Sequence, residues 1–393
     1  MMQLSSVLSR RAVMVGAVAL YALAQGGAAL AADTVKIGVI SALTGPGAPW
    51  GIAAAEGPRI AADEINAQGG LDVGGKKLKV EVVAYDDQYK TADAVAAFNR
   101  LVNQDGVKFV IILSSAGTMA LREAVMDNKV LGFSSAYTRK ALDKSNPYMF
   151  RLYSTPHEYV PSMVDWLKAN HPTAKRVAII NPNDETGWDQ TELGERVFKE
   201  KGFEVVGKEL YERALRDFQP TLTKLMAYKP DIIELGGTPP ATAGLIVRQA
   251  RELGYTGLIF KTGGAGPRDI VAAAGAQASE GLINMLYADP NNAGYKRIAA
   301  AYEKRTGHVP NEILVAYYDG ARAMLAAISK AGTADDTAKV AAALATAMPI
   351  ESVQGDKLSL GGKQAYGADL QIETVNYIGI IKGGQPVAIG KTR

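Results

Sequence analysis

Short apolar runs that alternate with segments of helical periodicity are the feature that most constrains the fold of this chain. In the first part, runs of strand length occupy residues 35–40, 78–84, 109–113 and 130–134, and apolar residues at helical spacing occupy 52–66 and 92–103. Pro58 lies inside the first helical segment, where it predicts a kink or a later helix start. The alternation predicts a doubly wound, mostly parallel α/β sheet.

The same alternation begins again near residue 176. Strand-like runs occupy 176–181, 203–206, 231–235 and 258–260, with helical segments at 189–201, 218–228 and 241–253. The last hundred residues carry helical segments at 313–330 and 337–347 and one strand-like segment at 372–381, too little for a third unit. We therefore predict two Rossmann-like α/β lobes, lobe 1 from 33–155 and about 290–370 and lobe 2 from 156–289 and about 371–393. A chain that crosses repeatedly between lobes predicts a hinge with a ligand cleft.

The N-terminal segment predicts a secretory signal peptide over residues 1–31. Arg10 and Arg11 precede an uncharged apolar run at 12–24, and Ala29-Leu30-Ala31 supplies a cleavage site. The apolar run is shorter than the roughly 20 residues of a transmembrane helix, which disfavours the alternative of a retained anchor. Ser9-Arg10-Arg11 resembles a twin-arginine signal but matches it loosely, so the export route stays open. We expect a periplasmic protein.

Composition excludes several classes of site. The chain has no cysteine, and its histidines at 157, 171 and 308 form no close-spaced ligand motif, so we expect neither a disulfide nor a metal site. The formal charge of +3 falls to +1 without residues 1–31, because that segment carries two arginines and no acid. A nearly neutral chain predicts no nucleic-acid partner.

The sequence also lacks complete catalytic and nucleotide-binding motifs. Leu113 stands where a G-x-S-x-G elbow around Ser115 needs glycine, and residues 263–266 do not complete G-x-G-x-x-G. Walker A and H-E-x-x-H motifs do not occur. Asp86 and Asp87 fit a solvated turn better than an acid–base pair, because adjacent strand residues face opposite ways. These absences favour a binding protein without a cofactor over an enzyme.

Two Ser/Thr-rich turns suit the binding of a carboxylate. Residues 114–118 read SSAGT where the run at 109–113 gives way to a helix, so hydroxyls and backbone N–H groups meet at the positive end of a helix dipole. Simple helix capping is the alternative interpretation. Residues 133–138 read FSSAYT after the next strand. Both turns lie at the carboxyl ends of strands, where open α/β sheets bind ligands.

Several segments together resemble one family. They are LTGPGAPWG at 43–51, AADEINAQGG at 61–70, YDD at 85–87, DGVKFV at 105–110, the turn at 114–118, and Arg151 with YST at 153–155. This pattern resembles the leucine/isoleucine/valine-binding family of type I periplasmic substrate-binding proteins, the solute receptors of ABC importers. The resemblance covers 33–393 and is strongest in the first lobe. It implies the type I periplasmic-binding fold with three hinge crossovers, and a monomer that delivers its ligand to an ABC permease and ATPase complex.

The resemblance also implies ligand-binding residues. Ser115, beside Ser114, falls on the carboxylate-holding serine, Ala136 and Thr138 on a backbone-plus-hydroxyl pair, and Trp50 on an aromatic wall. Tyr318 falls on a late aromatic residue, with Tyr317 as the other candidate. The remaining candidates are Tyr137 as a wall, either Thr186 or Trp188, Thr238 in the loop at 236–239, and Gly264 in the loop after 258–260.

One departure from the family's pattern bears on the ligand. Amino-acid-binding members carry an acid in the loop after the strand at 258–260, whereas this chain has TGGAG at 262–266. Burying an ammonium without a counter-charge would cost several kcal/mol, so we expect a carboxylate without an amine, such as an aromatic acid or a 2-oxo acid. We also expect the loop glycines to leave room for a planar ligand between Trp50, Tyr137, Trp188 and Tyr318.

Other interpretations remain open. One is a branched-chain or other amino-acid binder that uses Asp184 or Glu185 as its acid. Another is an exported ligand-sensing module that acts through a receptor; a permease gene or a sensor-kinase gene beside this one would separate the two. An α/β enzyme is the least supported.

Overall fold

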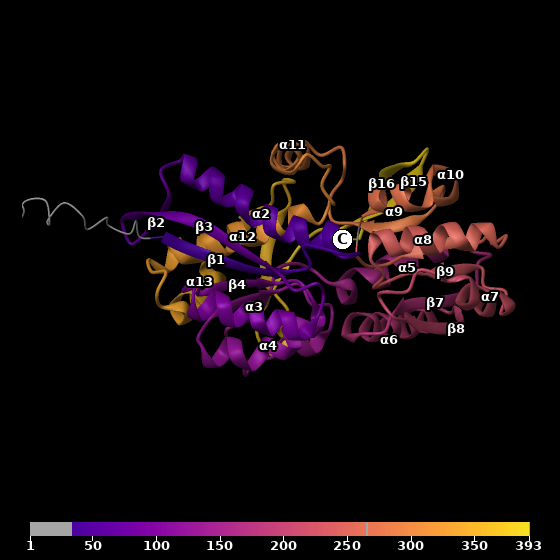
Figure 1. Cartoon of the computed structure of the whole chain (residues 1–393), viewed down its shortest axis with the longest axis horizontal. Coiled ribbons are helices and arrows are strands. Elements are labelled where there is room, and N and C mark those ends of the chain that lie inside the picture. Colours follow the sequence, from indigo (N-terminus) through magenta and orange to yellow (C-terminus); the bar gives the residue numbers. More distant parts are fainter. Residues whose placement is uncertain (1–33, 265, 393) are drawn as a thin grey trace, which may run out of the picture. The chain divides into compact units, whose positions relative to one another are not determined.

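The computed structural model describes residues 34–264 and 266–392, and from Val35 onward the chain packs as one compact unit. The predicted signal peptide lies outside the described residues. Two sheets organise the unit, and we call each sheet with its helices a lobe (Figure 1). Within the described residues, no helix has both the length and the hydropathy required to cross a bilayer.

Lobe 1 is built on a nine-stranded sheet in the order β12-β13-β14-β6-β5-β4-β1-β3-β2. The strands β1, β4, β5, β6 and β14 run parallel, with antiparallel pairs at both margins. The strands are β1 (Thr34–Ser41), β2 (Leu71–Val73), β3 (Lys76–Asp86), β4 (Phe109–Ile112), β5 (Leu131–Ser134), β6 (Met149–Arg151), β12 (Ile350–Glu351), β13 (Lys357–Gly361) and β14 (Gln371–Glu373).

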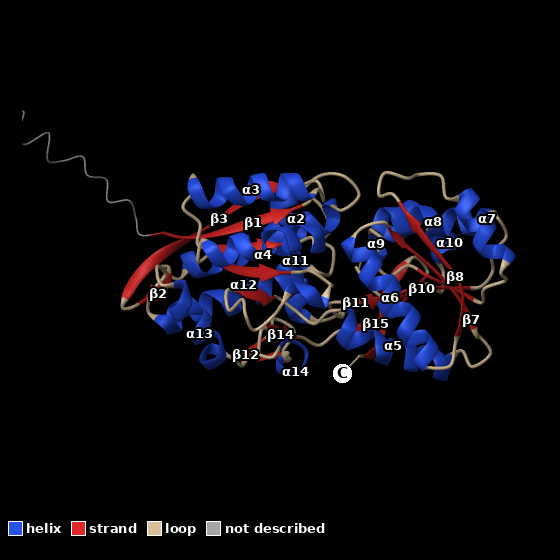
Figure 2. Cartoon of the chain, turned by 90° about the horizontal axis from the view of Figure 1, so that it is seen from below, coloured by secondary structure: helices blue, strands red, loops and turns tan. Residues whose placement is uncertain are grey.

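Helices lie on both faces of this sheet, with α3 and α4 on one side and α2, α12 and α13 on the other (Figures 1 and 2). The helices of lobe 1 are α2 (Ala48–Ala67), α3 (Thr91–Asn103), α4 (Ser115–Asp127), η1 (Arg139–Ala141), α11 (Ala293–Thr306), α12 (Leu314–Ala331), α13 (Thr337–Ala347) and α14 (Lys363–Tyr366). Pro58 stands inside α2, which begins earlier than predicted and continues through it.

Lobe 2 is built on a seven-stranded sheet in the order β16-β15-β11-β10-β9-β7-β8, parallel from β8 to β11. Its strands are β7 (Arg176–Pro182), β8 (Glu204–Tyr211), β9 (Ile232–Glu234), β10 (Leu258–Lys261), β11 (Ile283–Leu286), β15 (Tyr377–Lys382) and β16 (Gln385–Lys391). Its helices are α5 (Pro156–Asn170), α6 (Glu185–Glu200), α7 (Gln219–Ala227), α8 (Pro240–Glu252), α9 (Pro267–Ala274) and α10 (Ala276–Ser279). The predicted α/β class and two-lobe fold are confirmed.

The chain passes between the sheets three times, between β6 and β7, between β11 and β12, and between β14 and β15. The third passage corrects the single strand predicted at 372–381. That segment is two strands, β14 in the first sheet and β15 in the second. An apolar pattern does not record a change of sheet, because both halves are equally buried. The lobe boundaries themselves stay a prediction.

Candidate ligand-binding site

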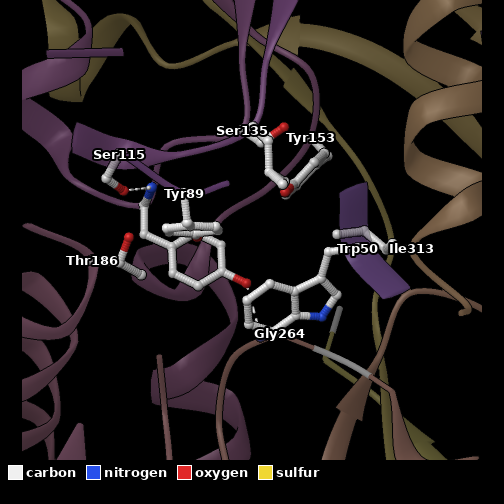
Figure 3. Close-up of a pocket in the computed structure, with 10 residues that line it drawn as sticks. Trp50, Tyr89, Ser115, Ser135, Tyr153, Thr186, Gly264 and Ile313 are labelled. Atoms are coloured by element: carbon white, nitrogen blue, oxygen red, sulfur yellow. Dashed lines mark hydrogen bonds between the residues drawn. The ribbon is translucent and has the colours of Figure 1, made fainter. Parts of the chain in front are cut away.

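A small pocket of about 20 Å³ lies where the strands of both sheets end (Figure 3). Loops after β3, β4, β5, β6 and β10 and residues in or beside α2, α4, α6 and α12 supply its walls. The ten lining residues are Trp50, Tyr89, Leu113, Ser115, Ser135, Tyr137, Tyr153, Thr186, Gly264 and Ile313. This is the carboxyl edge at which the sequence placed the two Ser/Thr turns.

The two serines of the first turn, Ser114 and Ser115, have different roles. Ser114 is the N-cap of α4, and its Oγ accepts a hydrogen bond from Gly117 N at 3.0 Å. Ser115, the first residue of α4, lines the pocket, and its Oγ accepts from Tyr137 N at 3.0 Å (Figure 3, dashed line). Capping therefore explains Ser114, whereas Ser115 places a hydroxyl in the pocket at the positive end of a helix dipole.

The second turn contributes Ser135 and Tyr137 rather than Ala136 and Thr138. Ala136 is buried, and its N–H donates to Ser134 Oγ at 2.8 Å. Thr138 is also buried: its Oγ1 accepts from Lys140 N at 3.4 Å and its carbonyl accepts from an Arg151 guanidinium at 2.6 Å. Neither Ala136 nor Thr138 is among the lining residues. In this geometry the hydrogen bonds of Ala136 and Thr138 stabilise the turn, and neither residue lines the pocket.

Gly263 and Gly264 let aromatic rings approach the backbone. A Cβ on Gly264 would lie 2.4 Å from Trp50 Cζ2, and a Cβ on Gly263 would lie 3.1 Å from Tyr137 Cε2. Gly264 also has φ +55°, a left-handed value that favours glycine. We expected these glycines to leave room for a ligand; that expectation is wrong, because the two rings occupy the space.

Four other candidates do not line the pocket: Trp188, Tyr318, Thr238 and Tyr317. Of the alternative pair on α6, Thr186 is the residue that lines it. Trp188 is 51% exposed and donates from Nε1 to Asn183 Oδ1 at 2.9 Å. The Tyr318 hydroxyl donates to Glu64 at 2.5 Å, so it is no wall of this pocket. Thr238 and Tyr317 are both buried but do not line the pocket. The Thr238 hydroxyl donates to Ile180 O at 3.3 Å. The Tyr317 hydroxyl shares a 2.7 Å hydrogen bond with Ser135 Oγ.

Tyr89 is the most informative residue that sequence reasoning missed. It stands in a strained turn after β3, where Gln88 has φ 47° and Tyr89 has φ 62°. The turn is held by Asp87, whose Oδ1 accepts from Tyr89 N at 2.9 Å. Asp87 is fully buried, so the predicted solvated turn is wrong for this residue, and burial raises its pKa to about 6. The YDD segment at 85–87 was the available signal.

Leu113, Ser135, Tyr153 and Ile313 are the other lining residues that were not predicted. Each lies in a loop or at the border of an element, where hydrophobic periodicity carries no information. Leu113 and Ser135 directly follow β4 and β5, so the carboxyl-edge rule applied residue by residue would have found them.

None of the ten lining side chains is charged, but two buried ionisable residues, Glu234 and Lys261, lie behind the loop at 262–264, which we call the glycine loop. Lys261 Nζ donates to Thr238 O at 2.9 Å and also to Gly263 O, and it lies 5.9 Å from the centre of the Trp50 ring. Glu234 accepts a hydrogen bond from the Thr262 hydroxyl. Burial raises the pKa of Glu234 to about 7 and lowers that of Lys261 to about 7. The charge behind the pocket therefore depends on pH near neutrality.

A third buried acid, Glu312, precedes the pocket residue Ile313. Within the described residues neither of its carboxyl oxygens is hydrogen-bonded to another residue; its own backbone N–H acts on the carboxylate, but burial has the larger effect and raises its pKa to about 7 from the ordinary 4.5. Asp269 and Arg268 from α9 also act on it. Since the folded state holds the extra proton, the free energy of unfolding should fall as pH rises from 4.5 to 7.

Glu312→Gln should therefore raise the free energy of unfolding by about 2–3 kcal/mol at pH 8 and change it little at pH 5. Urea unfolding at the two pH values measures the difference. Glu192→Gln, at an exposed position of α6, is the control and should have no effect at either pH. An equal gain from Glu312→Gln at both pH values would contradict the ionisation argument.

Comparison with known proteins agrees with this geometry. A family model described as periplasmic binding protein matches residues 34–382. A leucine-, isoleucine-, valine-, threonine- and alanine-binding protein of Pseudomonas aeruginosa is 30% identical over 321 residues, which cover 80% of this chain and 83% of that protein. By name it is a binding protein rather than an enzyme, in line with our expectation.

Two solved structures share the fold. A leucine binding protein from Thermotoga maritima superposes with a TM-score of 0.78 at 24% identity, covering 91% of this chain and 98% of that one. A solute binding protein of an ABC transporter from R. palustris, in complex with benzoate, superposes with a TM-score of 0.76 at 19% identity, covering 91% and 96%. With the family model spanning nearly all described residues, the chain belongs to the periplasmic binding protein family, in the leucine/isoleucine/valine-binding group of type I solute receptors.

Proposed function

We propose that this chain captures a small carboxylate without an α-amine, an aromatic acid or a 2-oxo acid, and delivers it to the permease of an ABC importer. Membership of the solute-receptor family supports the binding role, a periplasmic location and the permease and ATPase complex as partner. The observation that carries the ligand class is electrostatic. None of the ten described lining residues is an acid, and of the two buried ionisable groups behind the loop, Lys261 is the one that donates to Gly263 O and lies 5.9 Å from the centre of the Trp50 ring.

An amine-bearing ligand would fit this arrangement poorly. Its ammonium would find no carboxylate among the lining residues and would lie near the buried Lys261, and burying an unpaired ammonium costs several kcal/mol. A carboxylate has the opposite balance: Ser115 Oγ and the N-terminus of α4 offer donors and a positive dipole, and the Lys261 charge adds to the same potential.

The apolar part of the pocket suits a flat ligand. Trp50, Tyr89, Tyr137 and Tyr153 supply four aromatic rings, with Leu113 and Ile313 as aliphatic walls. The free space between these walls is only about 20 Å³, so a ligand of the size of benzoate requires the walls to move apart, and a flat ligand that stacks between the rings requires the smallest displacement. That the R. palustris protein holds benzoate on the same fold supports this class.

An amino-acid ligand is the second candidate, favoured by the name of the P. aeruginosa relative. The two acids considered from the sequence already have other partners. Asp184 caps α6 through Gly187 N and pairs with Arg213, and Glu185 lies 3.8 Å from Lys140. Glu234 is the acid nearest the glycine loop, through its bond to Thr262, so an amino-acid binder would depend on Glu234.

A thermal-shift panel tests the proposal, since a ligand that binds the folded state raises the unfolding temperature by mass action. We expect shifts with benzoates or 2-oxo acids and none with leucine, isoleucine or valine. Shifts with these amino acids alone would contradict the proposed ligand class and favour a site that uses Glu234.

Ser115→Ala should weaken carboxylate binding by about 1–3 kcal/mol, because a donor to a charged group is lost and Tyr137 N loses its acceptor. Titration calorimetry with the ligand found in the panel measures the change. Thr138→Ala is the comparison variant, since Thr138 lies outside the lining, and its effect should be smaller. Unchanged affinity in Ser115→Ala would remove Ser115 from the carboxylate site.

A further inference from the structure

Tyr137 joins the two lobes through the pocket itself. Its backbone follows β5 of lobe 1, where Tyr137 N donates to Ser115 Oγ. Its hydroxyl accepts from Gly264 N at 2.8 Å and shares a 3.1 Å hydrogen bond with the hydroxyl of Tyr287, both residues of lobe 2. One side chain of lobe 1 is thus hydrogen-bonded to the loops after β10 and after β11.

The same ring takes up space in the pocket. Tyr137 is 7% exposed and lines the pocket while packing against Gly263, where any Cβ would lie 3.1 Å from its Cε2. Burial raises the pKa of Tyr137 far above its ordinary value, so the hydroxyl stays protonated and keeps both bonds at any physiological pH. The ring is held at its backbone end by Ser115 and at its hydroxyl end by Gly264 and Tyr287.

We propose that Tyr137 is a specificity-determining residue that sets the upper size of the ligand and, through its hydroxyl, stabilises the contact between the lobes around it. The proposal rests on the proposed function in taking this pocket as the ligand site. A residue fixed at both ends cannot swing aside for a larger ligand without breaking two inter-lobe hydrogen bonds. Ligand size and lobe contact are therefore linked through one side chain.

Two substitutions separate these effects. Tyr137→Phe keeps the ring and removes the hydroxyl, so it should weaken small and large ligands alike, by about 3- to 10-fold. Tyr137→Ala vacates the space of the ring, so it should raise the affinity for 2-naphthoate relative to benzoate by about 10-fold or more. Tyr255→Phe is the matched control: Tyr255 is also 7% exposed and donates one hydrogen bond, to Leu258 O, within lobe 2.

Calorimetric titration of each variant with benzoate and 2-naphthoate gives the affinity ratio. An unchanged ratio in Tyr137→Ala would overturn the size role. If the wild-type protein binds amino acids instead, the proposed function fails, but the size role of Tyr137 can still be tested. The ratio of the affinities for tryptophan and alanine then replaces the ratio for 2-naphthoate and benzoate.

Small-angle scattering of the unliganded proteins tests the lobe contact with no ligand at all. Tyr137→Phe should have a larger radius of gyration than wild type, and Tyr255→Phe should not. Equal radii for the two phenylalanine variants would overturn the inter-lobe role.

Discussion

Replacing Lys261 with methionine is expected to weaken carboxylate binding about 100-fold, since removal of a buried, hydrogen-bonded charge costs about 2–5 kcal/mol. Two losses combine. The positive potential behind the pocket disappears, and the carbonyls of Thr238 and Gly263 lose the donor that fixes the glycine loop. Calorimetric titration at pH 6.5 measures the loss, with circular dichroism to establish that the variant is folded.

The pH dependence of wild type tests the same charge without a substitution. Both Lys261 and Glu234 have a pKa of about 7, so as pH rises through 7 the lysine loses its charge and the glutamate gains one. Both changes disfavour a bound anion, and affinity should fall between pH 6 and 8.5. Glu234→Gln removes the negative charge that the glutamate gains, and because that charge also raises the pKa of Lys261, the remaining fall in affinity should begin at lower pH than in wild type. Affinity that is independent of pH in wild type would contradict this role.

Gly264→Ala is expected to abolish binding and to lower the free energy of unfolding by about 2–4 kcal/mol, combining left-handed strain with overpacking. The new methyl group would lie 2.4 Å from Trp50 Cζ2 and must displace either the ring or the loop. Displacing the loop would also break the bond from Gly264 N to the Tyr137 hydroxyl. Urea unfolding and ligand titration measure the two effects.

Gly307→Ala is the matched control for backbone strain. Gly307, at the end of α11, has left-handed angles of φ +74° and ψ 7°, but a Cβ there would meet nothing within 4 Å. It should cost only about 1 kcal/mol and leave binding intact. If Gly264→Ala behaves like Gly307→Ala, the close contact between Trp50 and the loop is not part of the site.

The fold was largely predictable because buried parallel strands correspond to continuous apolar runs in the sequence. Residues 109–113 and 176–181 are examples, and they form β4 and β7, each of which pairs with a parallel strand on both sides. What the pattern could not predict was the division of 372–381 between two sheets. Pairing depends on neighbours far away in the sequence: β14 pairs with β6, and β15 with β11.

The site was predicted in part, and the misses have physical reasons. Thr186 and Trp188 are two residues apart on α6, about 200° around a helix of 3.6 residues per turn, so only one of them can face the pocket. Tyr318 matched the family pattern, but a nearby acid, Glu64, binds its hydroxyl. Tyr89 and Tyr153 enter from loops, whose direction is set by local contacts such as the bond from Tyr89 N to Asp87.

The most direct test of the proposed ligand class is a pair of calorimetric titrations of the wild-type protein with 4-methyl-2-oxopentanoate and with L-leucine. The two ligands share the carboxylate and the branched chain and differ only in a 2-oxo group in place of the α-ammonium. Because none of the ten described lining residues is an acid and Lys261 lies behind the loop, we predict that the oxo acid binds at least about 100-fold more tightly. Tighter binding of leucine would contradict the account.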